Sequence, residues 1–141
     1  MDVNKLIDAF NTQFTEFIST IQQAFPEDVD ILTVQNVFNR FKVNYPKVIA
    51  NYWYYNIYLL YNTEIENGNI DFFLNKDYSY DLTKNKHSQK IMEAINRVRE
   101  PFRLMTNDVL KKMIKYIQKL SKISVLIFTK EPSKPITNLI K

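Results

Sequence analysis

The sequence predicts a single all-α domain of about five helices with an aromatic core, and three observations support this prediction. Apolar residues recur at helical spacing along most of the 141-residue chain. One glycine in the whole chain leaves few of the Gly-containing turns on which β-hairpins depend. A chain of this length has the size of one domain, which we expect to comprise a helical domain at 1–128 and an extended, proline-containing tail at 129–141.

The first two predicted helices are separated by Pro26, because the residue before a proline disfavours helical geometry. The first runs from about Val3 to Phe25 and carries its apolar side chains within about 120° of a helical wheel, while its other faces are polar. The second starts in the acidic stretch at 27–30, since carboxylates favour helix N-termini, and reaches about Val43. Its inward residues are expected to be Val34, Val37, Phe38 and Phe41.

A third helix is predicted between Pro46 and Gly68, because proline suits the first turn of a helix and glycine suits the residue after its end. The residues between them have high β propensity, so a strand is the alternative. About twenty residues without a turn signal favour a helix. One expected face comprises Val48, Ile49, Tyr52, Trp53, Leu59 and Leu60.

The rest of the helical domain is expected to contain a loop and two more helices. Residues 69–86 mix Asp and Asn with an apolar cluster at 72–74, which predicts an ordered loop held on the core by its aromatic side chains. A fourth helix is expected near 88–99. A polar residue at 106–108 can cap a fifth helix that reaches about Phe128.

Charge divides the chain into two halves of opposite sign. Residues 1–81 carry five Lys and Arg against eleven Asp and Glu, a net charge of −6, whereas residues 82–141 carry fourteen against four, a net charge of +10. The acidic half also holds 17 of the 20 Phe, Tyr and Trp residues. Such asymmetry favours an anionic or oppositely charged partner. Opposite halves can pair head to tail between copies or contact different neighbours.

A tyrosine stripe on the third helix is the first candidate site, for a protein partner or a second copy of the chain. Tyr54, Tyr58 and Tyr61 follow the helical spacing i, i+4, i+7, and Tyr is enriched among the residues that dominate interface energies. The alternative is a central core helix whose tyrosine hydroxyls reach the surface, because a helix that is apolar on most sides is normally buried.

Lysines along one side of the fifth helix are the second candidate site, for an anion or a nucleic acid. Their ammonium groups recur at one-turn spacing within about 100° of arc and can follow phosphates along a nucleic-acid backbone. The alternative is a solvated face that keeps the protein soluble. Lysine in place of arginine argues against base-specific recognition. The residues are Lys111, Lys112, Lys115, Lys119 and Lys122.

Sequence motifs for catalysis, cofactors and metals are missing. The chain has no cysteine and too little glycine for a phosphate-binding loop. Its single histidine, His87, lies in a lysine-rich segment, which indicates a surface role. The Asp clusters lack EF-hand spacing and are better explained as helix caps and turn residues. We therefore expect a protein that is not an enzyme and that uses no cofactor, metal or small-molecule substrate.

Targeting and membrane-spanning signals are also missing from the sequence. No stretch approaches 18 uncharged apolar residues. The first five residues lack the basic and apolar regions of a signal peptide. We expect no membrane segment and an intracellular location.

Three stretches resemble a group of small, uncharacterised helical proteins encoded by large nucleocytoplasmic DNA viruses. They are FPEDVDI at 25–31, DFFLNKDYS at 71–79 and KYIQKLS at 115–121. The resemblance implies a viral origin and a non-enzymatic role in the particle, with the host cytoplasm or the virion as its location. It brings no catalytic residues. We therefore expect a structural or interaction protein of a larger assembly, with a non-specific nucleic-acid-binding protein as the alternative.

Overall fold

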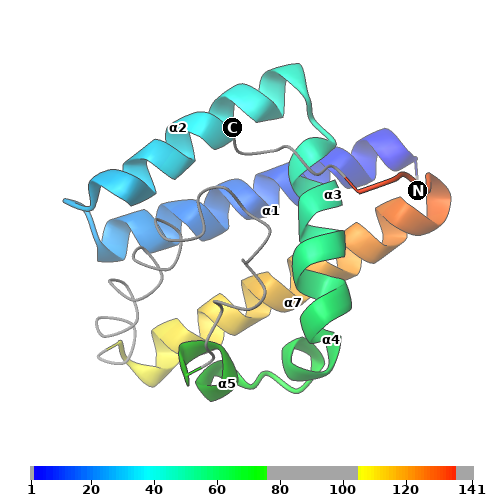
Figure 1. Cartoon of the computed structure of the whole chain (residues 1–141). Helices are drawn as coiled ribbons and strands as arrows, with labels where there is room; N and C mark the ends of the chain where they lie inside the picture. The colour runs from blue at the N-terminus through cyan, green and yellow to red at the C-terminus, as the bar shows by residue number, and fades with distance from the viewer. Residues whose placement is uncertain (1, 76–104, 136–141) are drawn as a thin grey trace.

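The computed structural model describes residues 2–75 and 105–135, and every regular element within these residues is helical. The predicted all-α class is therefore confirmed. Figure 1 shows α1 (Val3–Ala24) between α2 (Val29–Asn44) and α7 (Asn107–Lys130), with a further helical column crossing them. That column consists of α3 (Val48–Trp53), the π-helix η1 (Tyr54–Tyr58) and α4 (Leu59–Glu66), and the short α5 (Ile70–Asn75) follows it. The predicted helix near 88–99 lies outside the described residues.

The first helix, α1, has the boundaries that the sequence predicts to within a residue. Asp2 is its N-cap, and the Oδ1 atom of Asp2 accepts a hydrogen bond from the backbone N–H of Asn4 at 2.9 Å. This bond satisfies one of the donors that a helix start leaves unpaired. The helix ends at Ala24, shortly before Pro26. Its apolar stripe packs against α7 and α2, and Phe10 on that stripe is completely buried.

The second helix, α2, starts in the predicted acidic stretch. The Oδ1 atom of Asp28 accepts a hydrogen bond from the backbone N–H of Ile31 at 3.1 Å, just as α2 begins. Among the residues predicted to point inward, Phe38 is buried and Phe41 is half-buried. The side chains of Val34 and Val37 lie outside the described ones.

An aromatic cluster occupies the centre of the core, as predicted. Three phenylalanine rings of α1 surround Trp53 of α3 edge-on, each with its centroid 6.2 Å from the tryptophan ring centroid. These are Phe10, Phe14 and Phe17. The ring of Phe38 from α2 lies 4.5 Å from that of Phe14. Edge-to-face pairs of this kind contribute about 0.5–1.5 kcal/mol beyond the area that they bury.

The third predicted helix contains a π-helical turn that changes the residues on its inner face. From Trp53 onward, each residue that faces the core lies four positions after the one before it, at 57, 61 and 65. In an α-helix, with 3.6 residues per turn, each such step turns the side chain about 40° further around the axis. The i→i+5 bonding of η1 and the non-helical backbone of Tyr61 (φ −128°, ψ 22°) offset this drift. The inner residues are Ala50, Trp53, Ile57, Tyr61 and Ile65.

Two predictions for this helix are wrong as a result. Leu59 and Leu60 were expected on one face with Trp53, but Trp53 is buried whereas the two leucines are 44% and 54% exposed. Tyr61 was expected on the same stripe as Tyr54 and Tyr58 but is buried, and its ring lies 6.1 Å from that of Phe72 in α5. The π-helical turn therefore exchanges a leucine for a tyrosine at the core.

The end of α4 is fixed by the single glycine of the chain. Gly68 has a φ of +65°, a conformation that side chains with a Cβ atom rarely adopt. The N–H of Gly68 donates to the carbonyl of Ile65 at 3.1 Å, and the N–H of Asn69 donates to that of Glu64 at 3.0 Å. These two bonds form a Schellman motif, so the predicted helix end is confirmed.

The predicted loop at 69–86 is wrong where the structure describes it, because residues 70–75 form α5. Asn69 explains the difference. Its Oδ1 atom accepts a hydrogen bond from the backbone N–H of Phe72 at 3.2 Å, so a residue that was interpreted as a turn signal caps a short helix instead. Residues 76–86 of that loop lie outside the described residues.

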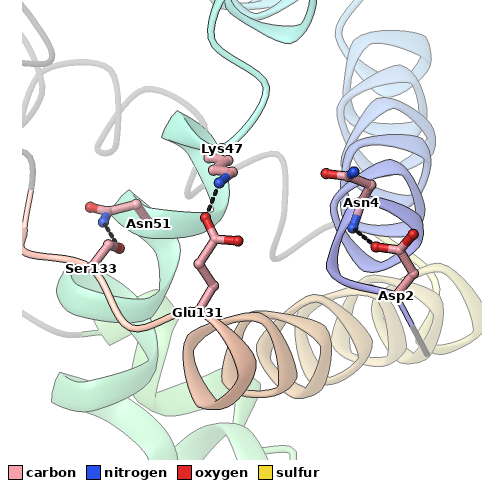
Figure 2. Close-up of polar contacts among 6 residues, drawn as sticks. All are labelled: Asp2, Asn4, Lys47, Asn51, Glu131 and Ser133. Atoms are coloured by element: carbon pink, nitrogen blue, oxygen red, sulfur yellow. Dashed lines mark hydrogen bonds and ion pairs between the residues drawn. The ribbon is translucent and has the colours of Figure 1, made fainter.

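The last helix, α7, begins at a predicted cap and leads into a tail that contacts α3. Thr106 Oγ1 accepts a hydrogen bond from the backbone N–H of Val109 at 3.3 Å. The helix continues past Phe128 to Lys130, and residues 132–135 have no regular secondary structure. Figure 2 shows the side-chain amide of Asn51 donating to the Oγ atom of Ser133 at 2.8 Å. It also shows the ion pair between Lys47 and Glu131.

Candidate interaction surface

The position of α3 against α7 is set by a buried hydrogen bond. The indole Nε1–H of Trp53 donates to the Oγ atom of Ser121 at 2.9 Å, and that hydroxyl donates to the carbonyl of Ile117 at 2.8 Å. Ser121 and Ser124 are 2% and 1% exposed, and their small side chains leave room for the indole at the contact. A buried donor without a partner costs about 1–3 kcal/mol. This hydrogen bond therefore favours one register of the two helices.

Aromatic rings from η1 and α7 stack beside this contact. The ring of Tyr54 lies nearly parallel to that of Phe128, with 4.2 Å between centroids, and to that of Tyr58, with 5.8 Å between centroids. Tyr55 packs edge-on against Tyr54 and Phe128. The structure thus brings together two of the three predicted partner-binding tyrosines, Tyr54 and Tyr58. It places the third, Tyr61, in the core.

Two tyrosines of this column keep neutral hydroxyl groups at physiological pH. Burial raises the pKa of Tyr52 above its ordinary value. The pKa of Tyr54 is also raised, first by burial and then by the negative charge that ionised Tyr55 and Tyr58 would place beside it. A neutral phenol both donates and accepts hydrogen bonds. Both hydroxyls can therefore donate hydrogen bonds at physiological pH.

A groove lies between α7 and the column of η1 and α4. It has a volume of about 550 Å³ and a mostly apolar lining, which is within the usual range for binding pockets. One wall holds Leu126, which is 50% exposed. We call this feature the α4–α7 groove, and its lining residues are Tyr58, Ile65, Glu66, Gln118, Ser121, Lys122, Val125 and Leu126.

The walls of the α4–α7 groove are joined by a side chain that the sequence analysis did not select. The Nε2 atom of Gln118 on α7 donates to the carbonyl of Ile65 at the end of α4, at 3.0 Å. That carbonyl also accepts the bond from Gly68 that terminates the helix. Gln118 therefore links the end of α4 to α7, and the groove is formed before any partner binds.

All five lysines of the predicted stripe are exposed on α7. Within residues 2–75 and 105–135, the ion pair that the structure contains joins Lys47 to Glu131, so no described carboxylate neutralises the stripe. Lys122 also lines the α4–α7 groove, and Lys119 and Lys115 continue from it along the helix. The basic stripe and the apolar groove therefore form one continuous surface. Glu66 supplies the negative charge of the groove lining.

The groove includes residues that the sequence analysis missed. Val125 and Leu126 were not among the candidate residues predicted for the fifth helix. A signal for Leu126 was nevertheless present. At 100° per residue, Leu126 falls within the arc of the lysine stripe, between Lys119 and Lys122, although a single exposed leucine is common on protein surfaces. Leu126 adds apolar surface to the lysine stripe where the stripe borders the α4–α7 groove.

Other kinds of site and related proteins add nothing to this surface. In the part of the chain that the structure describes, no three His, Cys, Asp or Glu side chains gather closely enough to hold a metal ion. None of the described helices is long and apolar enough to cross a membrane. No protein-family model, curated protein or solved structure matches the chain.

Proposed function

We propose that this chain is a non-enzymatic interaction protein that binds a protein partner through the α4–α7 groove. The observation that supports this proposal best is Leu126, a leucine that is 50% exposed on the wall of a mostly apolar groove of about 550 Å³. The setting that we propose is a larger assembly inside the cell. If the sequence resemblance is correct, that assembly is viral and the location is the host cytoplasm or the virion.

Energetics favour this surface as a contact site. Complete burial of a leucine side chain contributes about 1.5–3 kcal/mol relative to full exposure, so covering the exposed half of Leu126 contributes roughly half of that. Tyr58 is already held by its stack on Tyr54, and Gln118 already fixes the end of α4. Little conformational entropy is then lost when a partner binds. Ordered aromatic residues beside an apolar groove are typical of interface hot spots.

A photoreactive benzophenone amino acid at position 126 of the full chain tests the proposal. The labelled chain is irradiated in a nuclease-treated lysate of the cells that naturally make it. We expect it to form a covalent adduct with a protein. The same group at Thr12, an exposed position on α1, is the matched control. Tyr58→Glu in the chain labelled at position 126 should lower the adduct yield about fivefold, since a loss of about 1 kcal/mol changes an equilibrium by this factor. A yield at position 126 no higher than at position 12 would refute the proposed function.

Non-specific nucleic-acid binding is the second candidate function. It is supported by the five exposed lysines of α7, none of which pairs with a carboxylate in the described part of the chain. If about four of them each meet a phosphate of duplex DNA, the logarithm of the binding constant should fall against the logarithm of the salt concentration with a slope near −3.6. The acidic half of the chain, at −6, opposes this function unless it faces away from the nucleic acid.

Charge reversal within the lysine stripe separates the two candidates. Lys115→Glu with Lys119→Glu should weaken DNA binding alike for every sequence tested and flatten the salt dependence. Lys5→Glu with Arg40→Glu makes the same change in net charge at exposed positions outside the stripe and should have a smaller effect. A gel-shift titration of the unmodified chain with no salt dependence would remove the second candidate.

A further inference from the structure

The start of α2 carries a second exposed surface, with a chemistry that complements the groove. Val29 and Leu32 are 71% and 38% exposed, and residues three apart lie on the same face of a helix. Glu27, two residues before the start of this helix, is exposed as well. We call these three residues the α2 tip. The α2 tip therefore presents two apolar side chains next to a carboxylate.

The α4–α7 groove presents the matching features. Its lining is mostly apolar and includes Lys122 on the α7 side. The exposed Lys119 lies three residues earlier on the same helix. A carboxylate that reached the groove would be attracted to these lysines and repelled by Glu66 on the α4 side. Charge therefore favours one orientation of an incoming acidic, apolar helix end, with its carboxylate towards α7.

The two surfaces lie far apart on one molecule. Figure 1 shows the start of α2 at the left end of the view and α4 at the right. A chain with this arrangement cannot fill its own groove with its own α2 tip, but a second copy can reach it. The net charges of the two halves of the sequence, −6 and +10, add attraction between the acidic part of one copy and the basic part of another.

We infer that the occupant of the α4–α7 groove is the α2 tip of a second copy of this chain, an inference that rests on the proposed function. Val29 and Leu32 of one copy enter the groove of the next, and Glu27 pairs with the lysines on its α7 side. This contact is heterologous, because each copy uses two different surfaces, so it builds closed rings or open filaments. One helix end in one groove makes a small interface, and a micromolar or weaker dissociation constant is expected.

Complementary single-surface variants test this arrangement in the purified full chain. Leu126→Glu places a charge in the groove, and Val29→Glu places one on the α2 tip. In sedimentation equilibrium the average mass of the unmodified chain should rise with concentration to at least twice the 16.9 kDa of one copy. Each variant alone should remain monomeric. An equimolar mixture should form a dimer, because the intact tip of the Leu126→Glu chain fits the intact groove of the Val29→Glu chain. Raising the ionic strength from about 0.1 to about 1 M, which shortens the Debye length to about 3 Å, should weaken the assembly.

Charge exchange provides a second measurement if either of these variants does not fold. Glu27→Lys and Lys122→Glu should each weaken the assembly, and the chain that carries both should recover it. Assembly of the unmodified chain without dimers in the mixture, or without recovery in the double variant, would overturn the inference. A monomeric unmodified chain would overturn it too. If the probe at position 126 still captures a different protein, the proposed function stands without this inference, and if it captures none, both fail.

Discussion

The hydrogen bond between Trp53 and Ser121 gives a quantitative test of how α3 is held on α7. Ser121→Ala removes the acceptor of an indole N–H whose side chain is 5% exposed, at a donor–acceptor distance of 2.9 Å. A buried donor left unpaired costs about 1–3 kcal/mol. Alanine has the higher helix propensity, which offsets at most about 0.7 kcal/mol. The free energy of unfolding should therefore fall by about 1–2 kcal/mol.

Ser124→Ala is the matched control for this substitution. Ser124 is equally buried on the same helix, but its hydroxyl donates to the backbone carbonyl of Ser121 at 2.7 Å. That kind of bond to the preceding turn adds little to helix stability, so this variant should lose less than about 1 kcal/mol. In a Trp53→Phe background, which has no indole donor, Ser121→Ala should cost no more than Ser124→Ala, giving a coupling energy of about 1 kcal/mol.

Urea unfolding followed by far-ultraviolet circular dichroism measures all of these variants. Trp53 is the single tryptophan of the chain, so its fluorescence reports separately on the environment of the indole in the Ser121 variant. Equal losses for Ser121→Ala and Ser124→Ala, or a coupling energy near zero, would refute the claim that this hydrogen bond fixes α3 on α7.

Three further substitutions test other parts of the fold. Phe10→Ala should lower the free energy of unfolding by about 3–5 kcal/mol, because the side chain is completely buried. Thr12→Ala on the exposed side of α1 should change it by less than about 0.5 kcal/mol. Similar losses for the two variants in urea titrations would contradict the packing of α1. Gly68→Ala should cost about 1–2 kcal/mol, because φ is +65°, a conformation that is strained for a residue with a Cβ atom, and an unchanged melting temperature would count against the helix end. The raised pKa of Tyr52 means that the unfolded chain releases this proton at a lower pH than the folded chain does. Stability should therefore fall as pH rises above about 10, and fall less in Tyr52→Phe; identical pH profiles would show that this hydroxyl titrates alike in the folded and unfolded chains.

Local signals in the sequence were sufficient to predict the ends of the helices. Thr106 and Gly68 act through side-chain or backbone properties of one residue, and the structure uses both as predicted. The phenylalanines of α1 also behave as predicted, because their spacing leaves only one way to bury them. Asn69 was misread because asparagine suits both a turn and a helix N-cap, and the residues after it decide between these two roles.

The inner face of the third helix could not be predicted in the same way. Apolar and aromatic residues occur on most sides of it, so the hydrophobic pattern does not select between Leu60 and Tyr61 at the core. The π-helical turn decides that choice, and with it Trp53 and Ile65 are both buried. The α4–α7 groove was out of reach for a different reason. It joins residues about fifty positions apart, and no local pattern places Ile65 beside Gln118.

The most direct test of the central claim is a cross-linking measurement on the purified chain with the photoreactive group at position 126. Copies of the chain that contain natural nitrogen are mixed with copies labelled with the heavy isotope of nitrogen. The mixture is irradiated at high protein concentration, digested and analysed by mass spectrometry. If the α2 tip of one copy occupies the α4–α7 groove of another, linked peptides of mixed isotope composition should join position 126 to residues 27–33. Links confined to one isotope, or mixed links to a different part of the chain, would contradict the account.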